Sequence, residues 1–72
     1  MKSTERLSQF LIYKGITKHK FERSIGLSNG YMYNQLKTKG AIGSDILNKI
    51  HLQYPELNIL WLVTGEGLML LF

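Results

Sequence analysis

Four polar residues in the middle of the chain have side chains suited to the edges of DNA bases. Asparagine can bond adenine through two groups at once, lysine can bond guanine, and tyrosine can pack on a sugar or a thymine methyl group. Residues 29, 33 and 37 are four apart, so on a helix they would form one line, with residue 34 beside it. The candidate base-contacting residues are therefore Asn29, Tyr33, Asn34 and Lys37.

Two short helical patterns within residues 17–37 would have to position these side chains. Thr17 is a good N-cap for the first helix, and Phe21 and Ile25 fall four apart on one of its faces. Gly26 can adopt the left-handed conformation that ends such a helix. We therefore expect a first helix of roughly two turns, followed by a tight turn.

The second pattern predicts a helix capped by Ser28, with Met32 and Leu36 as its inward pair. The polar residues then face outward. Tyr31 and Tyr33 each lie about 100° of helix rotation from Met32, so both cannot be buried with it. We expect Tyr33 to be exposed and Tyr31 to pack partly against the corner between the two helices.

Charge is distributed unevenly along a chain whose formal net charge is +4. Residues 1–40 hold eight lysines and arginines against two glutamates, whereas residues 41–72 hold one lysine against three acids. Cations in the first turn of a helix slightly disfavour it, so Lys18 and Lys20 suggest phosphate binding, the alternative being a solvated surface. The candidate phosphate contacts are Thr17, Lys18, Lys20, Ser28 and Lys39.

The corner resembles the helix-turn-helix domains of the lambda-repressor-like family, also called the Xre or Cro/CI type. The resemblance covers about residues 3–69 and includes Ile42-Gly43-Ser44-Asp45, Tyr54-Pro55-Glu56-Leu57-Asn58 and Trp61-Leu62-Val63-Thr64-Gly65-Glu66-Gly67. It implies a compact all-α fold of five helices. It also implies a transcriptional regulator, acting as a repressor, that binds double-stranded DNA as a homodimer with its recognition helix in the major groove.

Two residues depart from the family pattern. Glu22 stands four residues before the turn glycine, where the family usually has a small residue because the two helices cross there. Gln35 stands three residues after Met32, where a second apolar residue is usual, and Leu36 follows it. If this change rotates the helix, Gln35 would face DNA and Asn34 would move to the rim.

Two further amphipathic patterns predict helices on either side of the corner. The first begins at a Ser3 cap and stops at Gly15, and the other begins at a Ser44 cap and is ended by Pro55. Their inward stripes are Leu7, Phe10 and Leu11 in the first helix, and Ile46, Leu47, Ile50 and Tyr54 in the other.

The last part of the chain, residues 58–72, is mostly apolar. Asn58 is the expected cap of a fifth helix, Leu57 can staple to Leu62, and Thr64-Gly65-Glu66-Gly67 ends the helix. Trp61 is expected in the core, and a domain this small should leave part of the following apolar run exposed. The expected dimer interface is Trp61, Leu68, Met69, Leu70, Leu71 and Phe72, the alternative being a tail folded onto the first helix of its own chain.

Composition indicates one domain over residues 1–72 and argues against several functions. There is no cysteine, and the two histidines have no ligand set around them, so we expect neither a metal nor a cofactor. The five acids are scattered, which argues against an enzyme. We expect no small-molecule ligand, no signal peptide and no membrane span, which requires about 20 apolar residues, and therefore a cytoplasmic protein.

Two other functions remain open from the sequence. A protein-interaction module with the same fold, such as an antitoxin, would share the corner. Binding to a membrane surface would use the basic half and the apolar tail, but these lie at opposite ends of the chain instead of on two faces of one helix.

Overall fold

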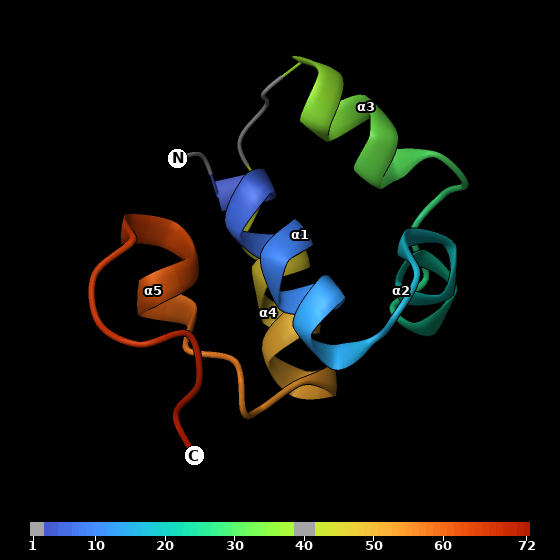
Figure 1. Cartoon of the computed structure of the whole chain (residues 1–72). Helices are drawn as coiled ribbons and strands as arrows, with labels where there is room; N and C mark the ends of the chain where they lie inside the picture. Colours follow the sequence, from blue (N-terminus) through green and yellow to red (C-terminus); the bar gives the residue numbers. More distant parts are fainter. Residues whose placement is uncertain (1–2, 39–41) are drawn as a thin grey trace.

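The first helix, α1 (Ser3–Lys14), lies at the centre of the computed structural model and contacts three other helices (Figure 1). The structure describes residues 3–38 and 42–72. The other helices in these ranges are α2 (Lys18–Ser24), α3 (Tyr31–Thr38), α4 (Ser44–Gln53) and α5 (Ile59–Thr64). No β-strand is formed by these residues, so the predicted all-α class with five helices is confirmed.

The core draws buried side chains from all five helices. Tyr54, just after α4, packs edge-on against Phe10 of α1 and stacks on Phe21 of α2, with ring centroids 5.7 and 5.9 Å away. Its hydroxyl lies 3.1 Å from Ser24 Oγ, so the buried phenol keeps a hydrogen bond. The core is made of Leu7, Phe10, Leu11, Phe21, Ile25, Met32, Ile50, Tyr54, Leu57 and Leu62.

Several helix ends follow the local sequence as predicted. Thr17 Oγ1 accepts a hydrogen bond from Lys20 N–H at 3.1 Å at the start of α2. Asn58 does the same for α5, where its Oδ1 accepts from Leu60 N–H at 3.1 Å. Gly65 ends α5 with φ +81°, in the left-handed region that glycine adopts readily. These caps depend only on neighbouring residues.

Two of the three predicted serine caps, Ser3 and Ser44, lie inside their helices. α4 begins at Ser44 itself, and the N-cap is Gly43, which makes no side-chain capping bond. α1 already includes Ser3, whose hydroxyl donates to the Val63 carbonyl at 3.4 Å. Ser3 therefore helps to connect α1 with α5.

Arg6 makes the main polar connection between α1 and α5. It is only 7% exposed, its Nε donates to the Leu62 carbonyl at 2.8 Å, and its Nη2 donates to the Val63 carbonyl at 2.9 Å. Carbonyl groups in the last turn of a helix have no partner within the helix. Arg6 therefore satisfies the end of α5, a role that its place in the basic half of the sequence did not suggest.

The C-terminal segment folds back on residues 56–58. Asn58 N–H donates to the Met69 carbonyl at 2.9 Å, Leu71 N–H donates to the Glu56 carbonyl at 2.8 Å, and Leu57 and Leu70 form an isolated antiparallel bridge. The tail therefore folds back within its own chain, as the alternative prediction held, and its backbone pairs with residues 56–58. None of the described helices is long and apolar enough to cross a membrane.

Candidate nucleic-acid interface

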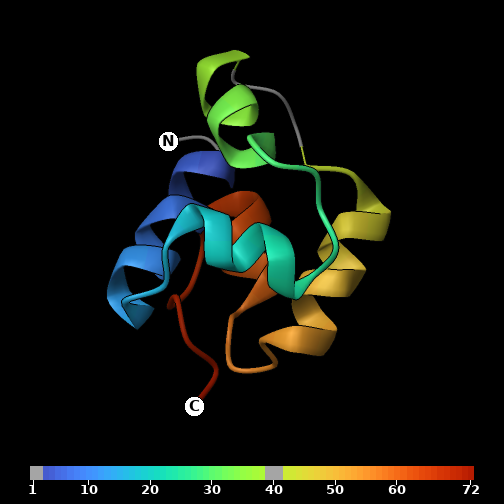
Figure 2. The same cartoon turned by 90° about the vertical axis from the view of Figure 1, so that its right-hand side faces the viewer.

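The two helices of the predicted corner lie together on one side of the molecule, with α3 above α2 (Figure 2). The turn between them is longer than predicted, because α3 begins at Tyr31. Gly30 has φ +83°, outside the right-handed helical region, and Ser28 uses its backbone carbonyl to accept from Tyr31 N–H at 3.2 Å. The prediction that Ser28 starts this helix was therefore wrong.

Glu22 of α2 supplies the hydrogen bonds at the start of α3. Its Oε2 accepts from Met32 N–H at 2.8 Å and its Oε1 accepts from Gly30 N–H at 3.2 Å. The residue is only 3% exposed. A buried carboxylate is costly unless it is hydrogen-bonded, and the positive end of a helix is a favourable place for it. The sign of this role in the sequence is that an acid stands at position 22, where the lambda-repressor-like family usually has a small residue.

The inward face of α3 consists of Met32 and, in part, Gln35. Met32 is fully buried, as predicted. Leu36 is only half-buried and lies outside the core, so its predicted role as the second inward anchor is wrong. Gln35 is half-buried as well, and its Oε1 is buried with no hydrogen-bond partner in the described part of the chain. The helix is therefore not rotated so as to expose Gln35.

The outward face of α3 carries three of the four candidate base-contacting residues. Tyr33 is 66% exposed, and Asn34 and Lys37 are exposed as well. Lys37 Nζ lies 6.0 Å from the centroid of the Tyr33 ring. Asn29 is exposed but belongs to the turn before α3, so the predicted helical line of three residues contains only Tyr33 and Lys37.

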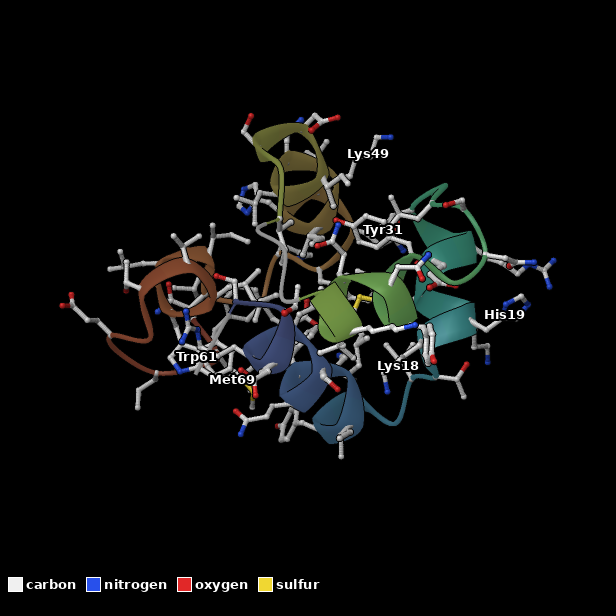
Figure 3. All side chains as sticks on the ribbon, turned by 90° about the horizontal axis from the view of Figure 1, so that it is seen from above. Lys18, His19, Tyr31, Lys49, Trp61 and Met69 are labelled. Carbon is white, nitrogen blue, oxygen red and sulfur yellow. The ribbon has the colours of Figure 1, made fainter. Side chains whose placement is uncertain are left out.

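Tyr31, in contrast, is directed toward α4 (Figure 3). It is half-buried and packs against the core, as predicted. Burial, and secondarily the charge of Asp45, raise the pKa of its phenol above the ordinary value of 10.0. Its hydroxyl is therefore neutral at physiological pH. The side chain helps to hold the two helices of the corner against the core.

The candidate phosphate contacts lie along the start of α2 and in the turn. Thr17, Lys18 and Lys20 are exposed at the start of α2, and Figure 3 shows Lys18 beside α3. Ser28 is exposed in the turn. Lys39, the fifth candidate, lies outside the described residues. The described candidate phosphate contacts therefore lie beside the outward face of α3, on the side where α2 is found.

The predicted dimer interface is partly used within the chain. Trp61, Met69 and Leu70 are half-buried and pack against the core, so Trp61 is only partly the core residue that we expected. Leu68 and Phe72 are 78% and 83% exposed, and Leu71 is exposed as well. The tail is therefore divided between an anchoring part and an exposed apolar part.

The described residues contain no group of three or more histidines, cysteines or acids that could hold a metal ion. A surface hollow of about 300 Å³ lies between α2 and α4, lined by Ser24, Ile25, Lys49, Leu52 and Gln53. None of these residues is a candidate base or phosphate contact.

Comparisons of this chain with protein-family models, curated proteins and solved structures found no match.

Proposed function

We propose that this protein binds double-stranded DNA sequence-specifically as a transcriptional regulator of the lambda-repressor-like type and acts as a repressor. The observation that carries the proposal is the division of α3 into two faces. Met32 is fully buried, whereas Tyr33 and Asn34 are exposed beside it. The major groove admits an α-helix, and an exposed amide on such a helix can reach base edges. In this proposal α3 is the recognition helix.

The charge of the corner supports a polyanionic partner. Glu22 is the only acid between residues 17 and 38, and it is buried against the backbone of α3. The exposed charges of the corner are therefore those of Lys18, Lys20, Arg23 and Lys37. Lysines on a recognition helix and beside it can bind the phosphates that flank the groove.

The exposed part of the tail supports a homodimer. Figure 3, seen from above α3, places Trp61 and Met69 on the opposite side of the molecule from His19. A two-fold axis on the Trp61 side would keep both α3 helices on one face of the assembly, as two half-sites one DNA turn apart require. Leu68, Leu71 and Phe72 supply exposed apolar surface for such an interface.

The backbone hydrogen bonds of residues 69–71 also support a homodimer. Met69 C=O and Leu71 N–H both point toward residues 56–58. In an antiparallel pair the intervening residue, Leu70, directs its backbone groups to the other side. In the proposed dimer, these backbone groups of Leu70 would bond the matching groups of a second copy of the chain.

Selection of random duplexes by the purified protein tests the proposal. We expect enrichment of a palindromic motif, because two symmetric recognition helices would read two half-sites. The same selection with an Asn34→Ala variant should lose preference at one position of each half-site. Recovery of no motif by the wild-type chain would contradict the proposal. The protein would act in the cytoplasm.

A protein-interaction module, such as an antitoxin that holds a toxin, is the alternative. The exposed Leu68 and Phe72 favour it, because apolar surface of this kind can serve a different protein as well as a second copy. A stable complex with another protein, together with no duplex enrichment, would support this alternative.

A further inference from the structure

We propose that Glu22 is a positioning residue for DNA readout, so that sequence discrimination by α3 depends on a buried carboxylate of α2. This inference rests on the proposed function. The carboxylate would not touch DNA. It would fix the place where α3 begins, and thereby the direction in which Tyr33 and Asn34 are presented.

The hydrogen bonds of Glu22 connect two helices, whereas those of an ordinary N-cap stay within one helix. An N-cap side chain precedes its helix directly and moves with it. Glu22 is instead part of α2 and lies 10 residues before Met32, whose N–H it accepts at 2.8 Å. The carboxylate therefore connects the recognition helix to the helix that carries Lys18 and Lys20. It holds the candidate base contacts of α3 in a fixed position relative to the candidate phosphate contacts of α2.

The turn between α2 and α3 does not by itself fix the position of α3 relative to α2. Gly30 has φ +83°, and a Cβ built on it would meet nothing within 4 Å, so no side-chain packing holds this residue in place. Its N–H is held by Glu22 Oε1 at 3.2 Å. Without the carboxylate, α3 would remain attached through the buried Met32 side chain. We therefore expect α3 to change its orientation and its first turn to loosen while the domain stays folded.

The test uses Glu22→Gln and Glu22→Ala in the full chain, with Glu66→Gln as a control. Glutamine replaces one of the two acceptor oxygens by an NH2 donor, so one of the two N–H groups loses its acceptor, and alanine accepts neither. Glu66 is exposed beyond α5 and provides the same change of charge away from the corner. For each variant we would measure hydrogen exchange of the Gly30 and Met32 amides, and the ratio of its affinities for a selected and a scrambled duplex.

We expect both amides to lose protection in the Glu22 variants, and the affinity ratio to fall in the order wild type, glutamine, alanine. The fall should reach roughly ten-fold, because a well-placed bidentate base contact contributes discrimination of about this size. Affinity for the scrambled duplex should change little. Glu66→Gln should leave the exchange and the ratio unchanged. If the alanine variant does not fold, the glutamine variant still provides the test.

Three results would overturn the inference. The first is unchanged protection of both amides in Glu22→Gln, and the second is lost protection with an unchanged affinity ratio. The third is an equal loss of affinity for both duplexes, which would mean a purely structural role. Failure of the wild-type chain to distinguish any duplex is a separate result, since it is seen without variants and contradicts the proposed function itself.

Discussion

The ammonium group of Lys37 lies 6.0 Å from the centroid of the Tyr33 ring, one turn earlier on the exposed side of α3. A cation near an aromatic face is attracted to it, so the two side chains support each other's orientation. Asn34, which follows Tyr33, is exposed on the same helix. These three side chains form the surface of α3 that would meet base edges.

The first prediction is that Asn34→Ala relaxes sequence preference without unfolding the domain. A bidentate bond from asparagine to adenine contributes roughly 1–3 kcal/mol of discrimination. Because Asn34 is exposed, its loss should leave the melting temperature almost unchanged. Binding assays on duplexes with each base at each position would measure the effect.

The matched control is Met32→Ala, two residues earlier on the opposite face of α3. Met32 is fully buried, and such truncations cost about 2–5 kcal/mol of folding free energy. This variant should lower the melting temperature strongly. A change of base preference in Gln35→Ala but not in Asn34→Ala would mean that the outward face has been assigned one residue out of register.

The second prediction concerns salt. If Lys18, Lys20 and Lys39 each contact a phosphate, the logarithm of the binding constant should fall against the logarithm of salt concentration with a slope of about −3 per protomer. Replacing one of them by alanine should flatten the slope by about one, similarly on selected and random DNA. Lys49→Ala, in the hollow between α2 and α4, is the control and should keep the slope. Salt-independent affinity would contradict phosphate binding by these lysines.

The parts of the fold that the sequence predicts well depend on neighbouring residues. Thr17 caps α2, Asn58 caps α5, and Gly26 ends the first helix of the corner with φ +75°. Each of these roles follows from the chemistry of one side chain and of the backbone within a few residues. The number of helices could therefore be predicted from the sequence.

The parts that the sequence missed depend on partners farther along the chain. Glu22 and Arg6 are charged, and charged residues are mostly exposed. Both are buried here, because Glu22 meets the start of α3 and Arg6 meets the end of α5. Ser28 was a reasonable cap by type, but the left-handed Gly30 excludes the residues before Tyr31 from the helix. Only the tertiary arrangement decides between these alternatives.

The third prediction is that the exposed part of the tail forms the dimer. Replacing Leu68 and Phe72 together by serine should give a monomer in sedimentation, with little change in melting temperature, because both side chains are largely exposed within one chain. Substitution is a better test than truncation after Gly67, which would also remove the packed Met69 and Leu70. Leu52→Ser, at a position of α4 that is 72% exposed, should leave the dimer intact. An unchanged dimer in the double variant would exclude these two side chains from the interface.

The fourth prediction concerns the ion pair between α1 and the segment before α5. Lys14 Nζ lies 2.7 Å from Glu56 Oε2, and this hydrogen bond lowers the pKa of Glu56 below its ordinary 4.5. The same bond raises the pKa of Lys14 above 10.5. A lowered carboxyl pKa stabilises the fold above pH 4.5, and this contribution is lost as pH falls through the folded-state value. A raised lysine pKa contributes below pH 10.5 and loses its effect as pH rises through the folded-state value.

Glu56→Gln should therefore lower the melting temperature slightly near neutral pH, and the difference from wild type should shrink in acid. The effect should be small because both side chains are partly exposed. Glu66→Gln, the control, should show no such pattern. A difference that grows as pH falls below 4.5 would contradict the assignment.

The last prediction is that Gln35→Leu stabilises the protein. The Oε1 atom of Gln35 is buried with no hydrogen-bond partner among residues 3–38 and 42–72, and such a buried acceptor costs about 1–3 kcal/mol. Leucine would remove this cost and place an apolar side chain beside buried Met32. The lambda-repressor-like family, which the sequence resembles, usually has an apolar residue at this position. We therefore expect a higher melting temperature, while Gln53→Leu, at an exposed position, should have little effect. Because Gln35 does not belong to the outward face, sequence preference should be retained. A melting temperature that falls would mean that the Gln35 amide contributes a stabilising contact to the fold.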